Sequence, residues 1–247
     1  MDEAAYIAMT GAKQIMMAQA INSHNLANST TTGFKADLHD IESLQINGPG
    51  YLGSRINAQV RPGGWNARQG ELITTGNPLD VAPGPGGWLT VQAPDGSEAY
   101  TKAGDLRINA IGQMTTATNL PVIGVSGPIA VPPHKEITVG HDGTISIVPI
   151  GQGPEAIAVV DRLKLVHLEP EQLTKGDDGL MRVIDGGRVF DDASMFVTSG
   201  TLEASNVSVV GAMVHMIELA RQYELQVKVI ETADDNAQSA TSMMRLS

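Results

Sequence analysis

Apolar residues recur at alternating spacings of four and three near the end of the chain. They are Val209, Met213, Met216, Ala220, Tyr223, Val227 and Ile230. A stripe with this spacing lies on one face of a helix and is typical of a surface that packs against a partner helix. The same register continues in a more polar form toward the end, so we expect a C-terminal helix within residues 205–247, capped by Ser205 or Asn206. We call the seven positions the helical seam.

A similar pattern occupies the beginning of the chain. Its apolar positions are Ala5, Met9, Ala12 and Met16. No proline interrupts them, so we expect a helix from about residue 2 to residue 28. The following residues are rich in Asn, Ser and Thr, whose side chains compete for backbone hydrogen bonds and so end the helix. Gly33 then permits a positive φ, and Phe34 would anchor the exit.

The middle of the chain has short apolar runs separated by turn residues. Three pairs of runs flank such turns, namely 88–93 with 98–102, 105–108 with 113–116, and 137–139 with 144–148. The stretch 162–168 alternates and is expected to be a further strand. Strands of this length with regular turn signals predict a mostly antiparallel β domain.

These elements predict an α+β fold with a β domain inserted between two terminal helices. Neither helix has a partner nearby in the sequence, so they must pair with each other, pack against other copies, or do both. We expect an antiparallel, coiled-coil-like inner domain. The expected boundaries are 1–35 for the N-terminal helix, 36–80 for an extended connector, 81–189 for the outer β domain, 190–204 for a return connector and 205–247 for the C-terminal helix.

Composition and charge exclude several classes of protein. The net charge is -11 and no cluster of Lys or Arg exists, which argues against nucleic acid as a partner. The chain has no cysteine, so it needs no oxidative folding step. No run approaches the roughly 20 apolar residues of a membrane span, and the acidic start does not resemble a cleaved signal peptide.

No residue pattern in the sequence is typical of a catalytic or metal site. The six histidines are scattered, without the spacing of a helical metal site, and no Gly-x-Ser-x-Gly elbow is present. We therefore expect no catalytic residue, no metal and no cofactor. Two other classes stay open at this point: an enzyme carried on the β domain, and a secreted adhesin or binding module, which would leave the helical ends without a role.

One motif is specific. It is made of Asn25, Leu26, Ala27 and Asn28, followed by Thr32, Gly33, Phe34 and Lys35. These residues resemble the N-terminal signature of flagellar rod and hook proteins, and we call them the assembly motif. The resemblance continues through residues 69–82, 104–124 and 199–207. The whole chain is therefore similar to the flagellar basal-body rod protein family.

The resemblance implies a structural subunit without enzymatic activity. Such a subunit would self-assemble through its terminal helices into the hollow helical drive shaft that motility needs. Its partners would be copies of itself, other rod proteins above and below it, and the flagellar type III export apparatus. It would be exported without a cleaved signal peptide to the periplasmic rod of the basal body. Length and C-terminal tail favour a proximal-rod subunit; the alternative is a distal-rod subunit or another axial protein.

Overall fold

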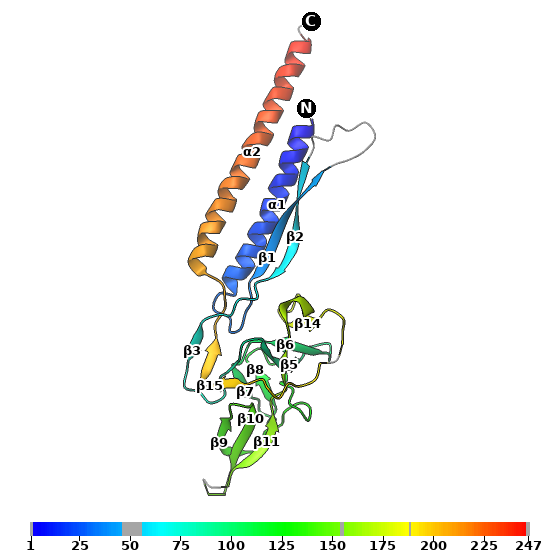
Figure 1. Cartoon of the computed structure of the whole chain (residues 1–247). Helices are drawn as coiled ribbons and strands as arrows, with labels where there is room; N and C mark the ends of the chain where they lie inside the picture. The colour runs from blue at the N-terminus through cyan, green and yellow to red at the C-terminus, as the bar shows by residue number, and fades with distance from the viewer. Residues whose placement is uncertain (1, 46–55, 154–155, 188, 246–247) are drawn as a thin grey trace. The chain divides into compact units, whose positions relative to one another are not determined.

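The computed structural model describes residues 2–45, 56–153, 156–187 and 189–245 (Figure 1). The chain divides into two compact units. The helical unit comprises Met1–Ser29, Ala36–Asn66 and Val207–Ser247, and the β unit comprises Thr30–Lys35 and Ala67–Asn206. The expected α+β class with antiparallel sheets is confirmed, because the strand pairs of the described residues run antiparallel.

Two helices lie side by side in the helical unit, α1 (Asp2–Ala27) and α2 (Val209–Arg245) (Figure 1). They run in opposite directions. Near one end, the side chain of Asn22 donates a 2.8 Å hydrogen bond to the carbonyl of Ala212. Further along, a Cβ at Gly11 would lie 3.3 Å from the side chain of Gln226. Neither helix has, over its described residues, a stretch apolar enough to cross a membrane.

Small residues line the buried face of α1. Ala8, Ala12 and Ala18 are all buried there, and Gly11 lies on the same side. Residues of this size allow two helix backbones to approach closely, because no long side chain separates them. The larger apolar residues that the sequence pattern placed on this face, Met9 and Met16, are instead exposed.

An antiparallel hairpin, β1 (Asp37–Gln45) with β2 (Ile56–Trp65), packs against α1 where the sequence predicts an extended connector. That expectation for the first part of residues 36–80 was wrong. A register shift at the start of β1 breaks the simple alternation. Proline and two glycines within β2 also contradict the usual composition of a strand. Residues 46–55 lie outside the described residues.

The β unit contains short strands, a single turn of 3₁₀ helix (Pro170–Gln172), and the loop that enters it from α1. Its strands are β3 (Leu72–Thr74), β4 (Val81–Pro83), β5 (Gly87–Gln92), β6 (Glu98–Thr101), β7 (Leu106–Ile108), β8 (Met114–Thr116), β9 (His134–Val139), β10 (Thr144–Pro149), β11 (Ala158–Arg162), β12 (Leu165–His167), β13 (Leu173–Lys175), β14 (Met181–Val183), β15 (Val197–Ser199) and β16 (Thr201–Glu203). The larger sheets have the orders β12-β5-β6-β14-β13 and β11-β10-β9, and three further pairs are β7-β8, β15-β4 and β16-β3.

The three predicted hairpins are confirmed as β5-β6, β7-β8 and β9-β10. The single strand predicted for 162–168 was wrong. It is divided between β11 and β12, which belong to different sheets, because the backbone amides of Leu163 and Lys164 turn to the separate carbonyls of Gly143 and Ile123.

The chain also returns to the helical unit differently from the expectation. Within residues 190–204, β15 and β16 pair with β4 and β3 instead of forming a connector. The following helix begins at Val209. Its cap is Ser208, whose hydroxyl accepts a 3.2 Å hydrogen bond from the amide of Gly211. The predicted caps, Ser205 and Asn206, precede the helix.

One apolar cluster forms the core of the β unit. It contains mainly aliphatic side chains, as the low aromatic content of 4% requires. The members are Val81, Leu89, Val91, Ala93, Ala99, Leu106, Met114, Val122, Ile129, Val131, Ile137, Val139, Ile145, Ile147, Leu163, Leu165, Leu180 and Val197. The cluster takes residues from both larger sheets and from the pairs β7-β8 and β15-β4, so these short strands share one core.

Candidate assembly site

The first half of the assembly motif lies at the end of α1. The side chain of Asn25 forms two hydrogen bonds with the backbone of Asp37: Nδ2 donates to the carbonyl at 2.9 Å, and Oδ1 accepts from the amide at 2.8 Å. Nδ1 of His24 lies 2.9 Å from the carboxylate of the same Asp37. These contacts attach the start of β1 to the end of the helix. Leu26 is half-buried and Ala27 is exposed.

Asn28 closes the helix by a local interaction. Its Nδ2 donates a 3.0 Å hydrogen bond to the carbonyl of His24, one of the last carbonyls of α1. This polar side chain is therefore used where the sequence pattern indicated the end of the helix.

The second half of the motif belongs to the β unit, in a segment that we call the signature loop, Thr30–Lys35. Gly33 has a φ of 67°, which confirms the expected positive value. Its amide donates to the carbonyl of Glu203 at 2.7 Å. A Cβ at this position would lie 2.3 Å from the carbonyl carbon of Lys102, so only glycine fits. Thr32, in the same loop, is half-buried.

Phe34 is held from two sides. Nζ of Lys175 lies 4.0 Å from the centroid of the Phe34 ring, in a cation–π contact, and donates a 2.7 Å hydrogen bond to the carbonyl of Lys35. The amide of Asn206 donates to the carbonyl of Phe34 at 3.2 Å. The loop is thus attached to residues that follow it by more than a hundred positions in the sequence.

Three ionisable side chains, Lys35, Lys102 and Glu203, are buried together, and we call them the charge cluster. Nζ of Lys35 lies 2.6 Å from Oε1 of Glu203, and Nζ of Lys102 lies 3.9 Å from Oε2. Oε1 also accepts a 3.0 Å hydrogen bond from the amide of Gly70. Nζ of Lys35 donates a second bond, 2.9 Å long, to the carbonyl of Arg68.

The cluster has more positive than negative charge. Burial lowers the pKa of Lys102 to about 8, although the carboxylate of Glu203 acts in the opposite direction, and the nearby charge of Lys35 lowers it further. Nζ of Lys102 donates a 3.1 Å hydrogen bond to the carbonyl of Gly84. Oε2 of Glu203 has no hydrogen-bond partner among the described residues.

Sequence reasoning identified Lys35 and Gly33 but missed Lys102 and Glu203. No sequence signal marks Glu203, because strand alternation would place Leu202 of the Thr-Leu-Glu run on the inner face. The structure instead buries Thr201 and Glu203 on the same side. A buried carboxylate requires a cationic partner, and that partner, Lys35, lies 168 residues away in the sequence.

The helical seam is only partly turned toward α1. Met216, Ala220, Val227 and Ile230 are half-buried, and Tyr223 is at the border of exposure. Val209 and Met213 are exposed, while the buried positions of α2 are Ala212 and Leu219. In an ideal α-helix, positions that recur every seven residues rotate around the helix axis by roughly 20° per heptad. Residues at one end of the seam, here Val209 and Met213, are therefore rotated out of the contact with α1.

Both helices expose large apolar side chains. Those more than half exposed are Tyr6, Met9, Met16, Val210, Met213, Val214, Ile217, Leu225 and Met243. Four of them, Val210, Met213, Val214 and Ile217, have the i, i+3, i+4, i+7 spacing of one helical face. We call this face the α2 exposed stripe. An apolar surface of this kind on a folded unit indicates an interaction site.

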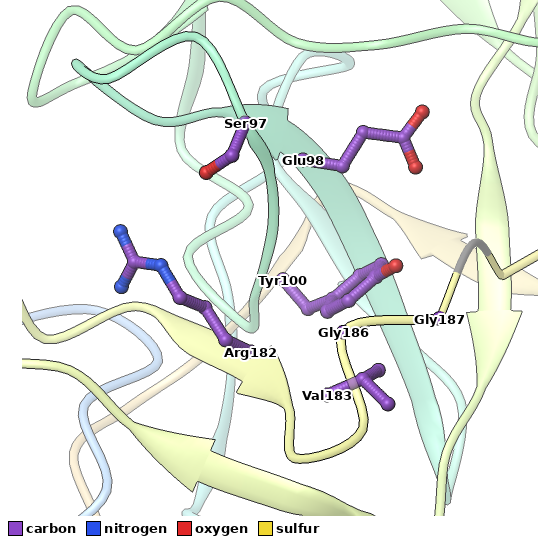
Figure 2. A pocket seen from close by; sticks show the side chains of 7 residues that line it. All are labelled: Ser97, Glu98, Tyr100, Arg182, Val183, Gly186 and Gly187. Atoms are coloured by element: carbon purple, nitrogen blue, oxygen red, sulfur yellow. The ribbon is translucent and has the colours of Figure 1, made fainter.

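The β unit also has a cavity of about 410 Å³ beside β6 and β14. Figure 2 shows the side chains that line it, which include Tyr100 and Arg182. Burial raises the pKa of Tyr100 to about 12, and two hydrogen bonds, 2.9 and 2.7 Å long, join the guanidinium of Arg182 to Asp178. Over the described residues, no group of three or more His, Asp or Glu side chains is arranged to hold a metal.

Comparisons with known proteins match different parts of the chain. A family model for the C-terminal part of the flagellar basal body rod FlgEFG proteins matches residues 198–243. A second model, for the D1 domain of the flagellar hook proteins FlgE/F/G, matches residues 85–147.

The flagellar basal-body rod proteins FlgF of Salmonella typhimurium and Escherichia coli K12 are each 41% identical to this chain, and each comparison covers the whole of this chain and the whole of the relative. The rod protein FlgG of Agrobacterium fabrum is 31% identical over 94% of this chain and 95% of its own.

Proposed function

This chain belongs to the FlgF family of flagellar basal-body rod proteins and is a structural subunit of the proximal rod; we propose that it assembles through the exposed faces of its paired terminal helices. Identity to FlgF proteins reaches 41% over the full length, against 31% for the FlgG protein compared, and this favours the proximal over the distal rod.

The first part of the proposal concerns the helix pair. We infer that α1 and α2 form the antiparallel, coiled-coil-like inner domain of the subunit. The close approach at Gly11 and the bond between Asn22 and Ala212 support this, because they join two helices from opposite ends of the chain. In this proposal, the half-buried seam positions, such as Met216 and Val227, stabilise the pair within one subunit.

The observation that carries the proposal is the α2 exposed stripe. Fully burying a side chain such as Ile217 is worth roughly 1.5–3 kcal/mol, and the pair within one subunit leaves most of that unused. Contacts with copies of this chain or with other rod proteins would bury the stripe. Val209 and Met213, the seam positions turned away from α1, belong to this second contact.

The assembly motif has a positioning role in this proposal. Asn25 and Asn28 fix the end of α1, and Gly33 with Lys35 fix the signature loop on the β unit. The chain would reach the periplasmic rod through the flagellar type III export apparatus, without a cleaved signal peptide, and would work there as part of a hollow helical shaft. Its proposed role is mechanical, and the cavity beside β6 is not part of it.

Ile217→Glu tests the proposal, because it places a charge in the middle of the α2 exposed stripe. Ile217 is 57% exposed, so we expect the isolated variant to fold and keep its helical circular dichroism spectrum. In the assembled rod, the carboxylate would lose its hydration at a cost of several kcal/mol. We therefore expect loss of the variant from purified basal bodies and loss of swimming.

The matched control is Gln222→Glu, which adds the same charge at an exposed polar position of the same helix. It should assemble and support swimming. Normal swimming by cells whose only copy carries Ile217→Glu would show that the stripe is not an assembly surface.

A further inference from the structure

The charge cluster joins two segments that are far apart in the sequence. Lys35 belongs to the signature loop near the beginning of the chain, and Glu203 belongs to β16, the last strand of the β unit. Their side chains are 3% and 0% exposed, so the 2.6 Å ion pair is fully removed from water. The amide of Gly33 also donates to the carbonyl of Glu203, which gives the loop a second bond to the same residue.

Because the pair is buried, the position of the Lys35 ammonium depends on the carboxylate of Glu203. A buried ammonium without its carboxylate is strongly unfavourable, so Lys35 would not remain in place without Glu203. Lys102, also buried, lies 3.9 Å from the other carboxylate oxygen and depends on the same residue for its compensating charge. One carboxylate therefore serves two buried cations, and the loop loses its anchor when this carboxylate is absent.

Glu203 in turn depends on the pairing of its own strand. β16 pairs with β3 between Thr201 and Thr74 and between Glu203 and Leu72, and the amide of Ala204 donates to the carbonyl of Glu71 at 2.8 Å. The amide of Gly70, which donates to Oε1 of Glu203, belongs to the segment just before β3. Pairing of β16 with β3 thus creates the position that the side chain of Lys35 occupies.

We propose that the charge cluster is a latch, in which the signature loop becomes ordered only when β16 has paired with β3. The coupling is reciprocal, as linkage between two sites requires, so weakening either side loosens the other. The latch itself does not depend on the proposed function. Its consequence for assembly does rest on that function: in a rod subunit, the signature loop, which carries the second half of the assembly motif, would become ordered only after the last strand of the β unit had paired.

Amide hydrogen exchange on the full-length monomer tests the latch, with variants Glu203→Gln and Lys35→Met. In Glu203→Gln, we expect exchange at the Gly33 amide to rise by about tenfold or more, because the lost charge leaves both lysines uncompensated. In Lys35→Met, we expect the amide of Ala204 to exchange faster as well as that of Gly33. The amides of the five-stranded sheet should keep the rates of the parent protein in both variants.

Glu98→Gln is the matched control, since Glu98 also forms a close ion pair with a buried lysine of the β unit, its carboxylate lying 2.7 Å from Nζ of Lys164. It should leave exchange at Gly33 unchanged.

Lys35→Met keeps Glu203 paired with Lys102, so this variant still tests the latch if Glu203→Gln does not fold. Unchanged protection of Gly33 in Lys35→Met would overturn the latch. Simultaneous loss of protection in the loop and in the five-stranded sheet would also overturn it, because the loop would then open only together with the whole β unit. Neither readout requires rod assembly, so failure of the latch and failure of the proposed function are distinct results.

Discussion

Leu219→Ala should destabilise the helical unit far more than the same substitution at Leu225. Both leucines lie on α2, but Leu219 is 4% exposed and Leu225 is 63% exposed. Replacing a buried leucine by alanine removes its transfer free energy and leaves a cavity, and typically costs about 2–5 kcal/mol. α1 carries small side chains on its contact face, which cannot expand to fill the space. We therefore expect a loss of about 3 kcal/mol in the free energy of unfolding of the helical unit.

Leu225→Ala is the control, with an expected change of about 0.5 kcal/mol or less in the monomer. Loss of the helical circular dichroism signal on heating measures both variants, because the described residues of the β unit contain only one turn of 3₁₀ helix. Equal destabilisation by the two variants would contradict the geometry of the pair. A larger effect at Leu225 would mean that α2 presents a different face to α1.

Gly33→Ala should undock the signature loop, since a positive φ costs roughly 1–2 kcal/mol and the added Cβ would also overlap the backbone of Lys102. Gly96 has a similar φ of 84° but open space around it. Gly96→Ala should therefore lower the free energy of unfolding only by the backbone cost, and Gly33→Ala by more, when both are compared by chemical denaturation. Equal losses would mean that the loop does not contact Lys102. The pKa of Lys102, lowered by burial from 10.5 to about 8, predicts a pH dependence: the unfolded chain binds more protons between these values, so stability should rise with pH in this window. Denaturation of the parent and Lys102→Met at pH 7 and pH 10 should show this rise only in the parent, and identical pH dependence would refute it.

The sequence predicts those parts of the fold, such as turns and hairpins, that are determined by residues close to one another in the chain. Residues such as Asp95 and Gly96 form the turn between β5 and β6, where the carboxylate accepts hydrogen bonds from the backbone and side chain of Ser97. Gly33 adopts the positive φ that its position suggested. These features depend on interactions between residues close in sequence, so a few neighbouring residues are enough to predict them.

The parts that could not be predicted depend on distant residues. The hairpin of β1 and β2 contains Pro62 and two following glycines, and it exists because the strands pair and pack on α1. The charge cluster similarly needs Lys35, Lys102 and Glu203 from three separate segments. The seam positions divide between two faces of α2, since Met216 and Val227 are half-buried while Met213 is exposed. Periodicity alone does not say which of these positions meet the partner helix within the subunit.

The distribution of side-chain size over the two helices is itself an argument for assembly. A helix that folds only within a monomer gains most by burying its largest apolar residues. Here α1 buries Ala8, Ala12 and Ala18 and exposes Met9 and Met16. The small residues allow close packing of the pair but remove little apolar area from water. The large residues, whose burial would contribute more, are available for contacts outside the subunit. Stability of the helical unit should therefore increase on assembly, since binding stabilises the folded form by mass action. Amide exchange along α1 and α2 that is as fast in assembled rods as in the monomer would contradict this argument.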